Sequence, residues 1–269
     1  MCRKKEPINW GQLKEGWISE VRDVLIPKLL KDDRFERSSH LIGRFEHEVV
    51  IWLKTGAFRP IIEIGNELAA AECLLDNLGG SDKLIYEPPM AGTDKRIDFL
   101  RISVLGKYDW IEVKTVTPQW DDNDSAWQRF IKINNSSPGN TNFNVNKCLA
   151  GAAVSGQAIK ARWSFVRRTA EVEAKAKFIP LNQAGNVWLL FCSNGSNWHI
   201  DELEDFSDYY HTNAHRADDW LQNEVDRYIF ANGISFDRTL AGFYYLARRH
   251  EDKSASLFSM NFSGPSFGR

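Results

Sequence analysis

The spacing of hydrophobic side chains predicts that helices come before the first strands. Apolar residues recur every three or four positions through 11–56, which fits two amphipathic helices that end at Gly56. A third helix is expected over 60–78, because a proline suits its first turn and the two glycines that follow suit its end. A helical region of three helices is therefore predicted up to residue 78.

Shorter apolar stretches then predict strands. Residues 84–86 look extended, and 97–105 alternates as a strand that turns near residue 106 into a second strand over 110–116. The polar segment 117–146 is expected to be a long loop, and long loops in compact domains are usually functional or disordered. The two longer strands would form an antiparallel hairpin.

The second half of the chain combines helices with one strongly apolar strand. Residues 186–192, Asn-Val-Trp-Leu-Leu-Phe-Cys, are typical of a buried central strand. Helices are expected over 148–177, 201–210 and 216–231, and the Ser-, Gly- and Phe-rich segment 254–269 is expected to be a loosely held tail. Helices interleaved with strands indicate an α/β fold.

Composition and charge limit the classes of function. Hydrophobic residues make up 43% of the 269 positions, which is enough for one sizeable core with appended parts. The net charge is -2, so nucleic acid would have to be bound by a local basic patch rather than by bulk charge.

The cysteines and apolar segments bear on the compartment. Cysteines 2, 73, 148 and 192 lie far apart with no Cys-x-x-Cys pair, so we expect thiols in a reducing cytoplasm. No signal-peptide core follows Met1, and no eighteen apolar residues run together. We therefore expect a soluble, cytoplasmic protein that is neither secreted nor bound to a membrane.

The strongest chemical signal is an acid followed by Glu-x-Lys in an apolar strand. Glu112 and Lys114 share one face of that strand, because side chains two residues apart point the same way. In a hairpin that turns near residue 106 or 107, Asp98 is expected opposite residue 114 or 115. Local geometry alone would bring the three side chains together.

Two carboxylates beside a lysine suit a divalent metal and a phosphate. Mg²⁺ prefers oxygen ligands, keeps several waters and takes substrate phosphate to complete its shell. The ion polarises the phosphoryl group and activates water, while the lysine stabilises the anionic transition state or lowers the pKa of the attacking water. The predicted chemistry is metal-dependent phosphodiester hydrolysis.

A fourth carboxylate is predicted on the helix that precedes the hairpin. Glu67 lies inside the apolar arc of helix 60–78, whereas Glu63 and Glu72 lie nearer its edges. A carboxylate on a core-facing arc needs a partner. A metal or its water would supply one, and so would an arginine or a capping contact near the start of the helix.

This order of acids resembles that of the restriction endonuclease-like PD-(D/E)XK nuclease superfamily. Glu67 on a helix, Asp98 on a strand and Glu112-Val113-Lys114 on the next strand carry the resemblance, which covers about residues 60–116. Ile97 stands where the name of the motif has proline, a residue that is often absent in the superfamily.

The resemblance implies a role for each residue of the motif. Asp98 and Glu112 would bind Mg²⁺ or Mn²⁺, and Val113 would offer its backbone carbonyl. Lys114 would assist the nucleophile, and Glu67 would support the metal.

The resemblance also implies a fold and a division of the chain. The superfamily has an αβββαβ core with a mixed central sheet flanked by helices, which helix 148–177 and strand 186–192 would complete. The expected parts are a helical N-terminal extension over 1–58, the nuclease core over 59–200, and a helical C-terminal part with its tail over 201–269.

Glu-x-Lys is a weak signal by itself, because the chain contains it three times. The copies at Glu173-Lys175 and Glu251-Lys253 lie in polar segments without an upstream acid on a strand, so we expect solvated charges or local helix pairs. A cross-strand salt bridge between Asp98 and Lys114 is the structural alternative for the first copy. Asp94 competes with Asp98 as the upstream acid but lies in the turn before the strand.

Other polar groups carry weaker signals. The bases of helix 148–177 would form a solvated face or a DNA surface, and Gln157 and Lys160 would reach the site from that helix. His211 and His215 have the i, i+4 spacing of zinc ligands but lack the glutamate of His-Glu-x-x-His, which favours an exposed helix end. Tryptophans 120 and 127 lie in the polar loop, where they would contact bases or a partner or pack the loop down.

The leading hypothesis is a Mg²⁺-dependent deoxyribonuclease of restriction, defence or repair type. Double-stranded DNA is the expected substrate, and a homodimer would cut both strands. The alternative is a non-cleaving nucleic-acid-binding or assembly module of the same fold, with a partner protein in a defence or repair complex. An RNA-directed nuclease would use the same metal chemistry.

Overall fold

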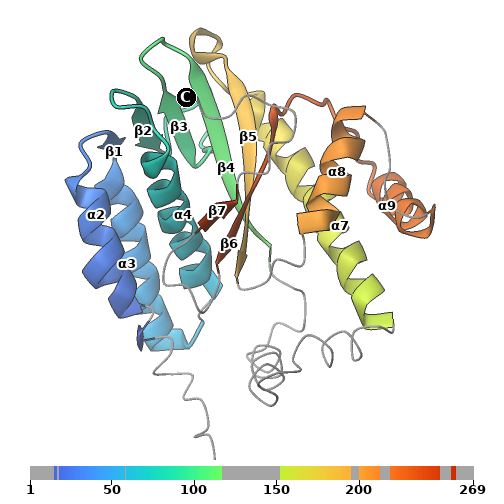
Figure 1. Ribbon diagram of the computed structural model, residues 1–269, viewed down its shortest axis with the longest axis horizontal. Coiled ribbons are helices and arrows are strands. Elements are labelled where there is room, and N and C mark those ends of the chain that lie inside the picture. The colour runs from blue at the N-terminus through green and yellow to red at the C-terminus, as the bar shows by residue number, and fades with distance from the viewer. Residues whose placement is uncertain are drawn as a thin grey trace, which may run out of the picture.

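The computed structural model describes most of the chain around one mixed β-sheet (Figure 1). The described residues are 15–16, 18–57, 59–116, 152–194, 200–212, 219–248 and 256–258. The sheet has seven strands in chain order. Their bounds are β1 Phe35–Glu36, β2 Lys83–Tyr86, β3 Phe99–Ile102, β4 Tyr108–Val116, β5 Asn186–Asn194, β6 Gly242–Arg248 and β7 Ser256–Phe258.

Strand directions change three times across the sheet. β1 and β2 are parallel, and β2, β3 and β4 are antiparallel to one another in turn. β4, β5 and β6 run parallel, and β7 returns antiparallel to β6. A crossover must join each parallel pair, and the helix α7, Ala152–Ala176, lies between β4 and β5 in the chain. The described residues therefore form an α/β fold with a mixed sheet.

Helices cover both faces of the sheet (Figure 1). The N-terminal helices α2, α3 and α4 lie on one face, and α7, α8 and α9 lie on the other. Two short helical segments accompany them, the π-helix η1 Val21–Leu25 and the 3-10 helix η2 Leu181–Gln183. The helix bounds are α2 Ile26–Lys31, α3 Ser38–Thr55, α4 Arg59–Asp76, α7 Ala152–Ala176, α8 Ile200–Thr212 and α9 Asp219–Ala231.

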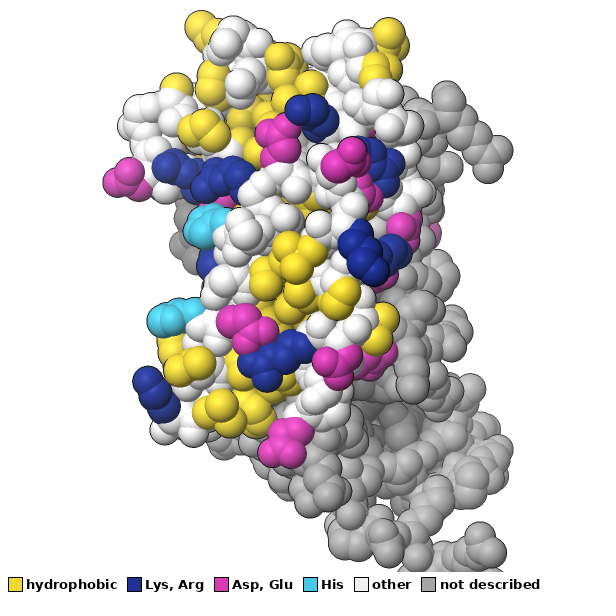
Figure 2. Space-filling view, turned by 90° about the vertical axis from the view of Figure 1, so that its left-hand side faces the viewer, with side chains coloured by type: hydrophobic (Ala, Val, Ile, Leu, Met, Phe, Trp, Pro, Cys, Tyr) yellow, Lys and Arg dark blue, Asp and Glu magenta, His cyan; other side chains and the backbone are white. Residues whose placement is uncertain are grey.

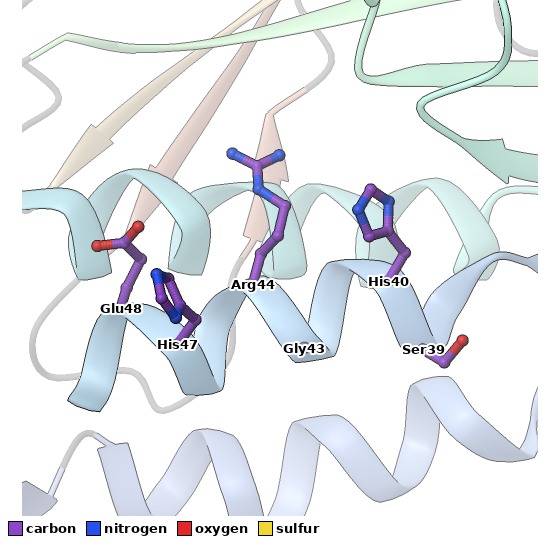
Figure 3. Close-up of a pocket in the computed structure, with 6 residues that line it drawn as sticks. All are labelled: Ser39, His40, Gly43, Arg44, His47 and Glu48. Carbon is purple, nitrogen blue, oxygen red and sulfur yellow. The ribbon is translucent and has the colours of Figure 1, made fainter. Parts of the chain in front are cut away.

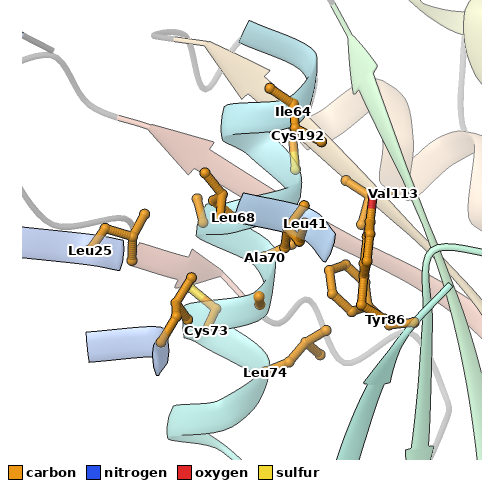
Figure 4. Packing of buried hydrophobic residues seen from close by; sticks show 14 of the residues in the cluster. Leu25, Leu41, Ile64, Leu68, Ala70, Cys73, Leu74, Tyr86, Val113 and Cys192 are labelled. Carbon is orange, nitrogen blue, oxygen red and sulfur yellow. The ribbon is translucent and has the colours of Figure 1, made fainter. Parts of the chain in front are cut away.

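The apolar faces of these elements form a separate core on each side of the sheet. Leu41 of α3 and Leu68 of α4 are fully buried against Tyr86 of β2 and Val113 of β4 (Figure 4). On the opposite face, Phe165 of α7 packs on the strands among other aromatic rings. Alternation along β4 sends odd-numbered side chains to the first core and even-numbered ones to the second.

The helices and hairpin expected from the sequence are confirmed with small shifts in their ends. Helix α3 ends as expected at Gly56, where a φ of 75° suits glycine and its N–H donates to the Trp52 carbonyl at 2.7 Å. The strand expected over 97–105 is shorter, because residues 103–107 form the turn. Cys73 and Cys192 are buried.

The prediction for the C-terminal part is wrong in one respect. It was expected to be helical with a loose tail, yet β6 extends the sheet beside β5 and residues 256–258 pair with β6. The segment Gly-Phe-Tyr-Tyr-Leu-Ala-Arg at 242–248 has the aromatic and apolar content of a buried strand.

No helix of the described ranges is long and apolar enough to cross a membrane.

Candidate metal-binding site

Asp98 comes immediately before β3, and Glu112 lies in the middle of β4. The register pairs Phe99 with Ile111, and continuing it by one residue brings Asp98 level with Glu112. Asp98 was expected opposite residue 114 or 115, and that prediction is wrong by two or three residues. The five-residue turn over 103–107 is centred on residue 105, whereas the turn was expected at residue 106 or 107.

A backbone hydrogen bond fixes Asp98 against β4. The Val113 N–H donates to Asp98 Oδ2 at 2.7 Å, and the Glu87 N–H donates to the Asp98 carbonyl at 2.7 Å. At the beginning of β3, the Asp98 carboxylate thus accepts the hydrogen bond that a backbone carbonyl of a neighbouring strand would otherwise accept. Among the described residues, no salt bridge joins Asp98 to Lys114, so the structural alternative considered for this pair does not hold.

The Glu112 carboxylate is fully buried and held on one side only. Lys114 from the same face of β4 bonds to Oε1, and Lys175 Nζ of α7 donates to the same oxygen at 2.5 Å. The second oxygen, Oε2, has no hydrogen-bond partner in the described part of the chain. A buried carboxylate oxygen without a donor is costly, so this atom marks a place where a cation would be stabilised.

Lys175 belongs to the site, although its sequence context predicted a solvent-exposed or locally paired side chain. The expectation that Glu173 and Lys175 are solvated charges or a local helix pair is wrong, because Glu173 is buried and accepts a 2.6 Å hydrogen bond from the Tyr210 hydroxyl. Lys175 points instead to Glu112 and donates to the Arg96 carbonyl at 2.9 Å. The third copy of the motif, at 251–253, lies outside the described residues.

Glu67 borders the two carboxylates and is bonded to other groups. Its Oε2 accepts from the Tyr86 hydroxyl at 2.7 Å and lies 3.4 Å from Arg44 Nη1 of α3. Burial raises the pKa of Glu67 to about 7, and the charges of Glu87 and Glu112 act in the same direction against Arg44 and Tyr86. Glu67 therefore binds a proton readily and is placed to respond to charge at the site.

The three carboxylates repel one another in a poorly hydrated setting. Burial, and then the charges of Glu112 and Glu67, raise the pKa of Asp98 well above its usual range. Burial alone would lower the pKa of Lys114, but Glu112 and Asp98 raise it above its usual range. A bound divalent cation would relieve this repulsion.

The donor set suits a hard cation that needs few protein ligands. No group of three or more His, Cys, Asp or Glu close enough to share a metal exists among the described residues. Mg²⁺ commonly binds one or two carboxylates and keeps water elsewhere in its shell. Asp98 and the free oxygen of Glu112 fit that requirement, and Glu67 would act from outside the first ligand shell.

A second base of α7 lies near Lys114. Arg168 is two turns from Lys175 on the stripe of α7 that carries Phe165 and Val172, and its charge lowers the pKa of Lys114. Its Nη1 donates to Glu171 at 2.8 Å, whereas its buried Nε has no partner among the described residues. Bases at 168 and 175 could have been recognised from the sequence, because both fall on the apolar stripe of this helix.

A shallow hollow on α3 adjoins the site through Arg44. Figure 3 shows His40 and Arg44 projecting from one side of the helix, with His47 one turn further along. Arg44 bonds to the Tyr86 hydroxyl and lies 2.7 Å from Glu87 Oε1, so its charge is already compensated. The full lining is Ser39, His40, Gly43, Arg44, His47 and Glu48.

The weaker candidates take no part in this cluster. Asp94 is exposed in the turn before β3. His211 is half-buried at the end of α8 with its ring against Tyr210 and Phe243, and burial and Arg238 lower its pKa. The remaining groups fall outside the described side chains, namely His215, Gln157, Lys160, Trp120 and Trp127.

Comparison of the chain with known protein families, curated proteins and solved structures finds no match.

Proposed function

We propose that the chain is a metal-dependent nuclease that hydrolyses DNA phosphodiester bonds with Mg²⁺ or Mn²⁺. The observation that carries the proposal is the buried Glu112 carboxylate, which faces Asp98 across β3 and β4 and leaves Oε2 free. Lys114 lies on the same face and bonds to the other oxygen. An acid pair with a free oxygen and an adjacent cation suits phosphoryl chemistry better than it suits a structural salt bridge.

The order of elements supports a restriction endonuclease-like fold for this proposal. The elements α4, β2, β3, β4, α7 and β5 follow one another as the αβββαβ core would require. β2, β3 and β4 are antiparallel neighbours in turn, and β5 lies parallel to β4. In this assignment residues 59–200 form the core, with additions over 1–58 and 201–269.

Each residue of the site would have its own role in metal binding or in stabilisation of the transition state. Asp98, Glu112 and the carbonyl of Val113 would hold the cation, and Glu67 would tune the charge around it. When bound, the cation polarises the phosphoryl group and lowers the pKa of a bound water. The raised pKa of Lys114 keeps its ammonium group charged at neutral pH, so it would stabilise the anionic transition state rather than accept a proton.

The location of basic side chains indicates how DNA would approach. On the face formed by α2 and α3, Figure 2 shows basic and acidic side chains intermixed with apolar ones. Several of these bases are paired, as Arg22 is with Glu46 and Lys28 is with Glu72. Arg168 is also paired, with Glu171, but it lies near Lys114 of the site, so DNA would approach the side of α7. A homodimer would bring two such sites to a duplex.

DNA cleavage under defined metal conditions tests the proposal directly. Plasmid and linear DNA are incubated with Mg²⁺, with Mn²⁺ and with EDTA, and single-stranded DNA and RNA are added as competitors. We expect cleavage that requires the divalent ion and is competed most strongly by duplex DNA. A protein that leaves every substrate intact under varied salt and pH would refute the proposal, and strong competition by RNA would reassign the substrate.

One observation favours a second candidate, a non-cleaving nucleic-acid-binding or assembly module that works with a partner in a defence or repair complex. Lys114 and Lys175 both pair with Glu112 without any metal, so the arrangement is also suited to a structural role. Salt-dependent DNA binding that needs no divalent ion and survives Glu112→Ala would support this candidate. Loss of metal-dependent cleavage in the same variant would support the nuclease.

A further inference from the structure

Lys175 links α7 to both segments that carry the site carboxylates. Its ammonium group donates to Glu112 Oε1 on β4 at 2.5 Å and to the Arg96 carbonyl, two residues before Asp98, at 2.9 Å. About three quarters of its side chain is buried, and Glu112 is fully buried. No other side chain of α7 is bonded to the Glu112 carboxylate among the described residues.

The charges at Glu112 exceed what a single carboxylate requires. Lys114 and Lys175 both bond to Oε1, so two ammonium groups surround one carboxylate oxygen while the other oxygen has no donor. A salt bridge selected only for stability would use both oxygens. Two ammonium groups on one oxygen, beside a second oxygen without a donor, suggest that one of them occupies the place of a charge that is added later.

We infer that Lys175 is the internal counter-ion of the site, a positioning residue that stabilises Glu112 before the metal arrives and competes with the metal for it. This inference rests on the proposed metal-dependent function. Entry of a divalent cation would add two charges beside the two ammonium groups, so the bond between Lys175 and Glu112 would weaken. Lys114, which belongs to β4 itself, would remain next to the carboxylate.

The inference separates metal affinity from metal-free stability. Lys175→Met removes the competing charge, so Mn²⁺ should bind about tenfold more tightly than to the wild type. The same change leaves a buried carboxylate with one partner fewer, so the melting temperature in EDTA should fall and Mn²⁺ should restore it. A residue that only supports the fold would lose stability without a gain in affinity.

The experiment measures Mn²⁺ affinity by isothermal titration and melting temperature with and without Mn²⁺. Lys175→Arg retains the charge and should behave as the wild type does. Lys177→Met is the matched control, because Lys177 lies just beyond α7, is 66% exposed and pairs with Asp237. If Lys175→Met does not fold in EDTA, refolding with Mn²⁺ should recover it.

The outcomes keep the two proposals apart. Tighter Mn²⁺ binding by Lys175→Met than by the wild type supports the counter-ion role. Equal or weaker binding, or a variant that Mn²⁺ cannot recover, overturns that role while a wild type that cleaves DNA keeps the nuclease proposal intact. Absence of Mn²⁺ binding in both the wild type and the variant overturns both.

Discussion

The carboxylate of Asp98 accepts a 2.7 Å hydrogen bond from the backbone N–H of Val113, the residue between Glu112 and Lys114. The relative position of the two acids is therefore set by the backbone of the hairpin and does not depend on a flexible side chain of β4. Because one partner of this bond is a backbone N–H, only the Asp98 side chain loses rotamer entropy when the bond forms. This suits a site that must hold its ligands in place.

Asp98→Asn should separate activity from stability. The amide oxygen can still accept from the Val113 N–H, and the neutral side chain removes repulsion with Glu112 and Glu67. We expect DNA cleavage to fall by at least about 100-fold, while the melting temperature in EDTA stays the same or rises. Asp94→Asn, in the exposed turn before β3, should change neither quantity. Cleavage at the wild-type rate by Asp98→Asn would exclude Asp98 from the site.

Lys114→Ala should lower the rate of the chemical step. The charge of this lysine is next to Glu112, and its loss should reduce single-turnover cleavage about 100- to 1,000-fold with a smaller effect on DNA affinity. Lys114→Arg keeps the charge but not the compact ammonium group, so partial activity is expected. The control is Lys107→Ala in the exposed β3–β4 turn, and equal losses in the two alanine variants would rule out a specific role for Lys114.

Local patterns predicted most elements because each depends on neighbouring residues. The apolar stripe of α4 and the hairpin of β3 and β4 repeat with periods that a helix or a strand requires. The periodic pattern could not predict the register of that hairpin, because the register depends on where the turn starts. A turn over 103–107 rather than one centred near 106 moved Asp98 from Lys114 to Glu112.

Lys175 shows why part of the site could not be predicted. Its contact with Glu112 spans 63 residues, and nothing in the tripeptide around it distinguishes a solvated pair from a site lysine. The helix that carries it must first be docked on the sheet. Position 175 on the stripe of Phe165 and Val172 was the one usable signal, because a base on a buried stripe needs an acceptor.

Glu67 should make stability depend on pH. Its pKa is raised from 4.5 to about 7, so between these values the folded protein holds a proton that the unfolded chain has released. The free energy of unfolding should therefore fall as pH rises from about 4.5 to about 7, by about 2–3 kcal/mol more in the wild type than in Glu67→Gln. Urea unfolding in EDTA at pH 5 and pH 8 measures this difference.

The control for Glu67 is Glu63→Gln, one turn earlier on α4 and about half exposed. It should retain the pH dependence of the wild type. If Glu67→Gln retains that dependence too, the proton resides on another group.

Gly185 is required for the close approach of β5 to β4. A Cβ atom at this position would lie well inside contact distance of the carbonyl of Tyr108, where β4 begins. Gly185→Ala should therefore lower the free energy of unfolding by about 3 kcal/mol, because backbone atoms of two strands would have to move apart. Gly80→Ala has open space around it and should have a small effect, and similar denaturation midpoints for the two variants would contradict this account.

Arg168→Ala should weaken DNA binding while leaving metal binding unchanged. The guanidinium group lies near Lys114, its Nε has no partner among the described residues, and its only described ion pair is with the half-exposed Glu171. A phosphate would compete well with that pair, so we expect the Kd for duplex DNA to rise about tenfold at moderate salt.

Arg167→Ala is the matched control for Arg168, since Arg167 precedes it on α7, is 49% exposed and faces the same Glu171 at 3.7 Å. Fluorescence anisotropy with labelled duplex across a salt series gives both the Kd and its salt slope, and isothermal titration gives the Mn²⁺ affinity. A role for Arg168 at the phosphate requires a larger loss and a shallower salt slope than Arg167→Ala shows. Equal losses would mean that α7 contributes only diffuse charge, because two neighbouring bases that share an acid would then act alike.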